Sequence, residues 1–257
     1  PEPPADVGSG PIAAVHSAEY LRFLRTIHAR WLRIPDASAE VIPNVHPDRR
    51  EVSYPASAVG QAGYHMADTA CPISAETWEA ARRGAMCAVA AADAVGGETA
   101  AAYALCRPPG HHAFAALAGG FCFLNNSAIA AERLRAAGRR VAILDVDLHH
   151  GNGTQGIFYH RGDVLTVSVH ADPIRFYPFF WGYAQERGEG AGCGANLNLP
   201  IPRGTGDEGF RAALGLGLER IADFGADTLV IALGLDAFAG DPFAGLAVTT
   251  AGFRAIG

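Results

Sequence analysis

Residues Val141–Gln155 read VAILDVDLHHGNGTQ, and this stretch decides the fold. Its apolar start, 141–144, has the composition of a buried strand, and acids and histidines follow it directly. Alternate residues of a strand share one face, so we expect Asp145, Asp147 and His149 to point the same way. Three such groups repel or desolvate one another unless a cation or protons lie among them. The stretch therefore predicts a strand that ends in a cation site.

Helices and strands alternate along the chain around this stretch. Their apolar runs are continuous, which is typical of strands covered on both faces, so we expect an α/β fold with a mostly parallel sheet and helices on both faces. Two long segments, 36–63 and 171–194, are expected to be irregular loops. The expected helices span 18–33, 75–95, 126–137 and 207–225, the last capped by Asp207, and the expected strands span 100–106, 140–146, 163–169, 196–199 and 227–233.

The acids and histidines fall where chemistry gathers in such sheets, in the loops after the carboxyl ends of strands. Asp147 and His149, together with Asp236 after a later strand, would form a three-ligand set with one open position, the layout of catalytic zinc sites. Any one of them alone is more simply a loop cap or a solvated side chain. The Asp-x-His spacing on an apolar strand favours a metal. Zinc is the first candidate for the bound ion, and Fe²⁺ or Mn²⁺ would suit the same donors.

A second histidine pair follows another of these segments. The motif RPPGHHA, 107–113, places His111 and His112 after a turn stiffened by proline. A carboxylate partner would favour the protonated ring, whereas a neutral amide partner would leave a ring able to accept a proton. The pair is therefore a candidate for acid–base work at the same edge of the sheet.

Composition excludes several classes of function. The formal net charge of −6 is spread along the chain, so no nucleic-acid partner is expected. No apolar run is long enough to span a bilayer, so no membrane association is expected. The start of the chain lacks the pattern of a signal peptide. Five scattered cysteines suit reduced thiols, which predicts a cytoplasmic location; these are Cys71, Cys87, Cys106, Cys122 and Cys193.

Four motifs in this order resemble the zinc-dependent histone deacetylase family, and most closely its bacterial acetylpolyamine amidohydrolase and deacetylase-like amidohydrolase branch. They are RPPGHHA, GGFCFLNN at 119–126, ILDVDLHHGNGTQ at 143–155 and GLDAFAGDP at 234–242. The resemblance implies a three-layer, arginase/deacetylase-like fold with zinc on Asp147, His149 and Asp236. It also implies hydrolysis of acetyl or other short acyl groups from small-molecule acetylated amines, such as acetylpolyamines, or from acetyl-lysine.

The resemblance assigns roles to further residues. His111, partnered by Asp145, would be an electrostatic histidine, and His112, partnered by Asn152, would be the general base. The tunnel for the acyl group would be lined by Gly120, Phe121 and Tyr177. Two potassium sites are implied, one on Asp145, Ser168 and the carbonyls of Asp147, His149 and Val169, and the other involving Phe158, Arg161 and Val164. Resembling enzymes also form a homodimer contact that narrows the tunnel mouth, for which the loop 36–63 is the candidate here.

The sequence departs from the family pattern in two ways. It reads as a single catalytic domain over 1–257 that lacks the opening strand and the Gly-Gly-Tyr segment, whose tyrosine donates to the developing oxyanion. We therefore expect these residues to hold the metal ligands but to hydrolyse acetyl-amides poorly. At the positions aligned with the acids of polyamine-selective relatives stand Val59 and Ala70. The nearby Asp68 and Glu76 could compensate by meeting the cationic amine, but charges at the start of a helix are the favoured interpretation.

The residues leave three other interpretations of the function open. GNGTQG, 151–156, also matches a dinucleotide fingerprint, but this match alone is weak. A dinuclear, arginase-like ureohydrolase would need additional carboxylates where Gly151 and Phe238 stand, and about two manganese ions per chain instead of one zinc would support it. A non-catalytic acetyl-amine binding module would bind a hydroxamate without turnover.

Overall fold

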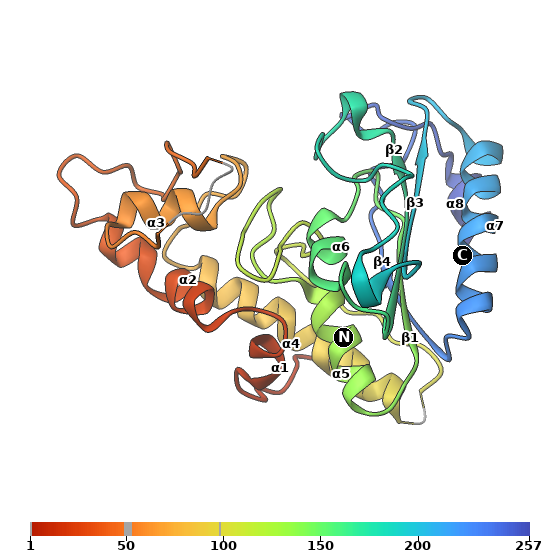
Figure 1. Ribbon diagram of the computed structural model, residues 1–257, viewed down its shortest axis with the longest axis horizontal. Helices are drawn as coiled ribbons and strands as arrows, with labels where there is room; N and C mark the ends of the chain where they lie inside the picture. Colours follow the sequence, from red (N-terminus) through yellow and green to blue (C-terminus); the bar gives the residue numbers. More distant parts are fainter. Residues whose placement is uncertain (1, 49–52, 98) are drawn as a thin grey trace. The chain divides into compact units, whose positions relative to one another are not determined.

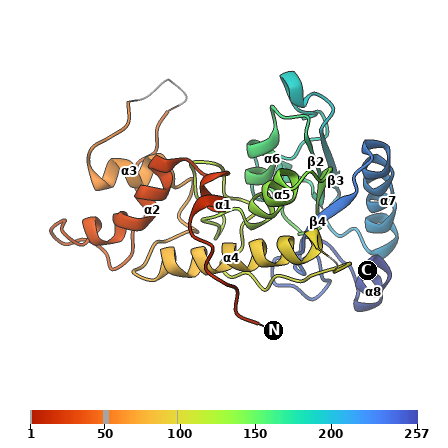
Figure 2. The same cartoon turned by 90° about the horizontal axis from the view of Figure 1, so that it is seen from below.

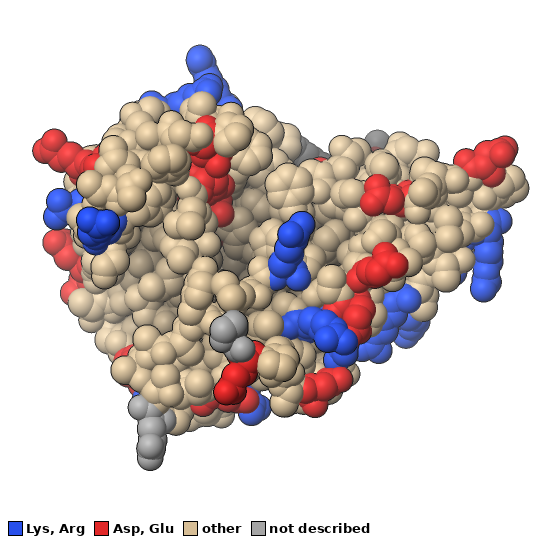
Figure 3. Space-filling model, turned by 180° about the vertical axis from the view of Figure 1, so that it is seen from behind, with Lys and Arg blue, Asp and Glu red and all other residues tan. Residues whose placement is uncertain are grey.

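The computed structural model of the protein describes residues 2–48, 53–97 and 99–257. The chain forms two compact units, Pro1–Arg133 and Leu134–Gly257, which are described separately. In the described ranges, no helix is both long and apolar enough to cross a membrane. On the face that Figure 3 shows, acidic and basic side chains are interspersed. The expectation of one catalytic domain over 1–257 stays a prediction.

The first unit is built from helices and long connections. In α2 (Ala18–Trp31), the buried residues recur at helical spacing as expected, and the Ser17 hydroxyl accepts a hydrogen bond from the Tyr20 N–H at 3.2 Å. The expected helix over 75–95 is α4 and starts two residues later. The elements of this unit are α1 (Gly10–Ala13), α2, α3 (Ala58–His65), α4 (Thr77–Gly96) and the first part of α5 (Asn126–Ala136), which continues into the second unit.

Two expectations for this unit are wrong. The segment 100–106 is not a strand: Tyr103 and Leu105 are 71% and 64% exposed, and no strand of the described first unit pairs with them. An apolar segment forms a strand only where it can hydrogen-bond to a neighbouring strand and pack against a core. The loop expected over 36–63 ends in a helix, because the Ser57 hydroxyl caps α3 at the Gly60 N–H (3.1 Å) and α3 packs on α2. Residues 49–52 of that loop lie outside the described ranges.

The second unit holds a four-stranded parallel sheet in the order β3-β2-β1-β4 (Figure 1). In this register, Asp145 at the end of β1 lies beside Ser168 of β2 and Ala232 of β4. The carboxyl ends of the strands therefore meet at one edge. The elements are β1 (Val141–Asp145), α6 (Asn152–Phe158), β2 (Val164–Ala171), the 3-10 turns η1 (Pro173–Arg175) and η2 (Gly190–Gly192), β3 (Asn196–Ile201), α7 (Asp207–Phe224), β4 (Thr228–Ala232) and α8 (Thr250–Ile256).

Helices cover both faces of this sheet, as expected. Helix α6 lies on one face and α7 on the other in both Figure 1 and Figure 2. Every residue of β1 and β2 is buried. The run in β1 is apolar up to Asp145, as expected for a strand covered on both faces. In β2, by contrast, buried polar residues alternate with buried apolar ones; the polar residues are Thr166, Ser168 and His170. In β4 alternate side chains are exposed, Ile231 to 54%, so this strand is covered less completely than predicted.

Asp207 does not cap α7, contrary to the sequence-based expectation. Gly206 is the N-cap residue, and the Asp207 carboxylate accepts hydrogen bonds from the Thr249 N–H and hydroxyl, both at 2.7 Å. These two bonds lower the pKa of Asp207, and they join the start of α7 to the start of α8. The helix ends at Gly225 (φ +72°), as the sequence predicts.

Candidate metal centre

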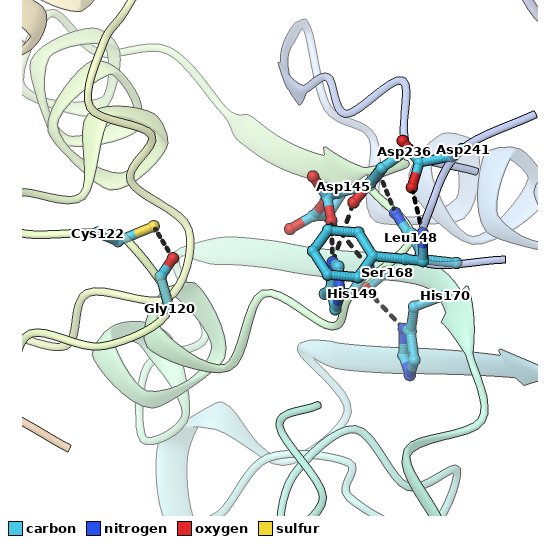
Figure 4. A network of polar contacts seen from close by, with 11 residues as sticks. Gly120, Cys122, Asp145, Leu148, His149, Ser168, His170, Asp236 and Asp241 are labelled. Atoms are coloured by element: carbon cyan, nitrogen blue, oxygen red, sulfur yellow. Dashed lines mark hydrogen bonds and ion pairs between the residues drawn. The ribbon is translucent and has the colours of Figure 1, made fainter. Parts of the chain in front are cut away.

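Three side chains from two loops of the second unit converge at the carboxyl edge of its sheet. Asp147 and His149 follow β1, and Asp236 follows β4. Their ligand atoms lie within 4.8 Å of one another. The His149 Nδ1 lies 3.2 Å from the Asp147 Oδ1 and 3.0 Å from the Asp236 Oδ2, a contact drawn in Figure 4. The structure thus brings together the three ligands that the sequence predicted.

Backbone hydrogen bonds, and not the strand itself, place these side chains. Strand β1 ends at Asp145, so the shared strand face expected for Asp145, Asp147 and His149 does not extend to the last two. The chain turns instead: the Asp145 carboxylate accepts from the Asp147 N–H (3.1 Å), and the Asp147 carboxylate accepts from the His149 N–H (2.8 Å). The Asp236 Oδ1 accepts from the Leu148 N–H at 2.9 Å (Figure 4). One oxygen of each of these three carboxylates therefore accepts a hydrogen bond from a backbone N–H.

Gly234 leaves the space that the Asp147 carboxylate occupies. A Cβ on Gly234 would lie 2.5 Å from the Asp147 Cγ and closer still to its Oδ2. The glycine is therefore required by the close approach of the loop after β4 to the Asp147 carboxylate, a candidate metal ligand.

The electrostatics of the triad suit a cation. Burial opposes protonation of His149, but its hydrogen bonds with Asp147 and Asp236 outweigh burial and raise its pKa to about 9. The two carboxylates thus favour positive charge at the His149 Nδ1, between them, where a divalent cation would bind. Two carboxylates and one imidazole are donors that a divalent transition metal accepts, with a position left open. Among the described residues, this is the one His/Cys/Asp/Glu cluster of that kind, which fits a mononuclear centre.

Aromatic rings of the same unit surround the imidazole. The ring centroid of His149 lies 5.3 Å from that of Phe176, 5.2 Å from that of Phe243 and 6.2 Å from that of Tyr177. Tyr177 was predicted to line the tunnel, whereas Phe176 and Phe243 were missed. The signal that could have found Phe176 is the aromatic density of 176–181, and the one for Phe243 is its place directly after GLDAFAGDP.

Residues of the first predicted potassium site lie at the carboxyl end of β1 and in β2. Asp145 and Ser168 are neighbours in the sheet and are both buried, and both line a small cavity with His150. The Ser168 hydroxyl lies 2.8 Å from the Nδ1 of His170, a buried histidine to which no role was assigned from the sequence. Val169 is fully buried. A potassium ion at this place stays a prediction.

The second predicted potassium set gathers around the start of β2. The Phe158 carbonyl accepts from the Arg161 N–H at 2.9 Å, and the Arg161 guanidinium lies over the Phe158 ring at 5.0 Å. The same guanidinium pairs with Asp163 through bonds of 2.9 and 2.7 Å, beside Val164. An ion at this set also stays a prediction.

The predicted acid–base histidines are buried neighbours in the first unit. The ring centroids of His111 and His112 are 3.9 Å apart. A Cβ on the preceding Gly110 would lie 2.5 Å from the Asn126 N and 2.7 Å from the Leu124 O, which explains the glycine in RPPGHHA. Asn152, the predicted partner of His112, is buried at the first position of α6 in the second unit. The roles of these residues stay predictions.

A parallel α/β sheet that carries one Asp–His–Asp centre at its carboxyl edge defines a metal-dependent enzyme of the hydrolytic kind. The family model described as the histone deacetylase domain matches residues 2–257. The chain belongs to the histone deacetylase family.

Named relatives lie within the amidohydrolase branch. The acetylpolyamine amidohydrolase of Burkholderia pseudomallei is 49% identical over 255 residues, which are 99% of this chain and 74% of that protein. The acetylpolyamine amidohydrolase of Mycoplana ramosa is 44% identical over 256 residues, 99% of this chain and 75% of that protein. A crystal structure of the Burkholderia pseudomallei acetylpolyamine aminohydrolase superposes with a TM-score of 0.95, at 49% identity, over 98% of this chain and 74% of that one.

Proposed function

We propose that this metal-dependent family member hydrolyses the amide bond of acetylated amines, releasing acetate and a free amine. The observation that carries the proposal is the convergence of Asp147, His149 and Asp236 within 4.8 Å at the carboxyl edge of a parallel sheet. The names of the relatives support acetylpolyamines as the amine class. Acetyl-lysine is the second substrate class to be compared.

We propose zinc as the ion, held by Asp147, His149 and Asp236. When bound, such an ion supplies Lewis-acid activation of a water molecule and of the acetyl carbonyl. The chain's own contribution there is to hold the two carboxylates by backbone N–H groups, so that one oxygen of each stays directed at the imidazole.

His112 is proposed to accept the proton of the attacking water, because the family resemblance pairs it with the neutral amide of Asn152. His111, paired with Asp145 in that resemblance, is proposed to stay charged and to act electrostatically. A positioned base contributes about 10²- to 10⁴-fold in rate. Phe121 and Tyr177, with Gly120, are proposed to line the path of the acyl group, and two potassium ions are proposed at the sets described above.

The alternative functions have less support. A dinuclear ureohydrolase would need carboxylates where Gly151 and Phe238 stand. The dinucleotide reading of 151–156 would place a pyrophosphate beside the acids Asp145 and Asp147, which would repel it. A cytoplasmic location is proposed from the five cysteines, which are all free thiols. A homodimer through 36–63 is likewise a proposal.

The test is acetate release from N-acetylputrescine and from an acetyl-lysine peptide, measured for the zinc-loaded protein and its His112→Ala variant. We expect faster release from the acetylated diamine and a loss of about 10²-fold or more in the variant, with its zinc content unchanged. Equal release by the variant would remove His112 from the role of general base.

A further inference from the structure

A tight turn in the first unit carries Phe121. The Gly119 N–H donates to the Cys122 carbonyl at 3.1 Å, and the Cys122 N–H donates to the Gly119 carbonyl at 2.8 Å. The two central residues have positive φ, +50° at Gly120 and +69° at Phe121. These are the features of a type I′ turn. The Phe121 side chain at its tip is 54% exposed.

The conformation of Phe121 is unfavourable for its residue type. Positions with positive φ in such turns favour glycine, asparagine or aspartate, and a bulky side chain there is strained. Because the ring is more than half exposed, burial of the ring does not account for the conformation. Strain of this kind persists only where the surrounding structure holds it, and it concentrates at functional sites.

The carboxylate of Asp68 holds this turn from the neighbouring segment. Its Oδ2 accepts from the Gly120 N–H at 3.0 Å, and its Oδ1 accepts from the Ala70 N–H at 2.9 Å. One half-buried side chain thus fixes both its own loop and the peptide group between Gly119 and Gly120, at the start of the turn. Hydrogen bonds to a charged acceptor are stronger than those between neutral groups.

Further contacts join the same two segments. The Ala118 N–H donates to the His65 carbonyl and the Ala67 N–H donates to the Ala118 carbonyl, both at 2.8 Å. On the other side of the turn, the Cys122 thiol donates to the Gly120 carbonyl at 3.3 Å (Figure 4). The peptide groups on both sides of Gly120 therefore have side-chain partners, and Asp68 supplies the charged one.

This arrangement corrects the interpretation of the acids near 70. Glu76 does precede a helix, α4, as expected for a helix-start charge. Asp68 does not: it lies beyond the end of α3, and its two oxygens are directed at the backbone of the turn. Its carboxylate is thus already engaged by two N–H groups, which does not favour direct recognition of a cationic amine.

We propose that Asp68 is a positioning residue that holds the Phe121 ring in its exposed, left-handed conformation, ready for the flat stem of the acylated amine. The inference rests on the proposed function, in which Phe121 lines the path of the acyl group. Asp68 acts through the Gly120 N–H and does not touch substrate. Removal of the Asp68 carboxylate should therefore make the turn more mobile, and the Phe121 ring with it.

The first measurement is hydrogen exchange of the peptide that contains Gly120, followed by mass spectrometry. We expect Asp68→Ala to accelerate exchange at this turn by about tenfold or more. Asp93→Ala is the matched control, because Asp93 is an exposed acid of the same unit that binds Arg133 at 2.6 Å, and it should leave the turn unchanged. If Asp68→Ala does not fold, the isosteric Asp68→Asn, whose single acceptor oxygen can serve only one N–H fully, should show an intermediate acceleration. Unchanged exchange in the variants would overturn the inference.

The second measurement is kcat/KM for N-acetylputrescine in a double-mutant cycle. Asp68→Ala should lower it by about tenfold at constant zinc content, and Asp68→Ala combined with Phe121→Ala should be no worse than Phe121→Ala alone. Additive losses would overturn the link from Asp68 to Phe121. Absence of acetate release by the unaltered protein would instead contradict the proposed function, while the exchange result would still decide the role of Asp68.

Discussion

At the scale of single residues, Gly234 leaves room for one of the three candidate metal ligands, although it lies outside that set. Its missing side chain is the space into which Asp147 turns, and a Cβ would meet the Cγ of that ligand at 2.5 Å. The ligand would have to move, since β4 and its following loop leave the backbone of Gly234 close to Asp147.

We therefore expect Gly234→Ala to weaken zinc binding without removing a ligand. The expected loss of affinity is about 10- to 100-fold, the range seen when the supports of metal ligands are altered. Zinc per chain after dialysis against a competing chelator measures it. Gly215→Ala in α7 is the control, because a Cβ there meets no atom within 4 Å. Equal zinc retention by both variants would show that Asp147 is not constrained by Gly234.

The sequence was enough to predict the three candidate ligands and their convergence, but not the residues that surround them. Asp147 and His149 lie two residues apart after an apolar strand, and Asp236 follows another, so parallel-sheet topology alone brings them to one edge. Phe176 and Phe243 approach His149 only through the course of two irregular loops, for which the sequence carries no periodic signal. The proposed role of Asp68 was also hidden, because its bond to the Gly120 N–H joins residues fifty-two positions apart.

At the scale of elements, side-chain burial distinguishes two strands that were predicted correctly from a segment that is not a strand. β1 and β2 were predicted to within two residues, because both are buried throughout and are rich in the aliphatic and β-branched residues that favour strands. The equally apolar segment 100–106 is not a strand, since no neighbour in its described unit pairs with it. α3 was missed because its glycine-containing sequence has weak helix propensity and its stability depends on packing against α2.

The junction before α2 contains a pH-sensitive group. His16 is buried and its Nε2 accepts from the Asn125 N–H at 2.9 Å, which requires a neutral ring. Burial lowers the pKa of His16 to about 4, partly opposed by the Ala115 and Phe114 carbonyls. Since this value lies below the usual 6.5, the unfolded chain binds the proton more readily than the folded one. The stabilisation is present above about pH 6.5 and is lost as the pH falls toward 4.

Acidification from pH 7 to pH 4 should therefore cost on the order of 3 kcal/mol of unfolding free energy through His16 alone. Urea unfolding at a series of pH values measures this loss, with His16→Gln as the comparison. The variant should be less stable at pH 7 and should show a shallower decline between pH 6.5 and 4. Parallel pH profiles for the two proteins would contradict the assignment of this proton to His16.

At the scale of the whole molecule, the proposed chemistry requires one metal ion per chain. Family membership extends over residues 2–257, and the three ligands form the one cluster of metal-binding side chains among the described residues. Positions 151 and 238, where a second metal would need carboxylates, hold glycine and phenylalanine. A single catalytic ion, bound by two carboxylates and one imidazole, is thus what the chemistry of the chain supports.

The most direct measurement is acetate release from N-acetylputrescine as zinc is titrated into the metal-free protein, beside the Asp236→Asn variant. This substitution keeps an oxygen that can accept from the Leu148 N–H but removes the charged ligand, so the fold should persist. We predict release that rises with zinc and saturates at about one equivalent per chain, and none above background in the variant. Release that is independent of zinc, that needs two ions, or that is unchanged in the variant would contradict the account.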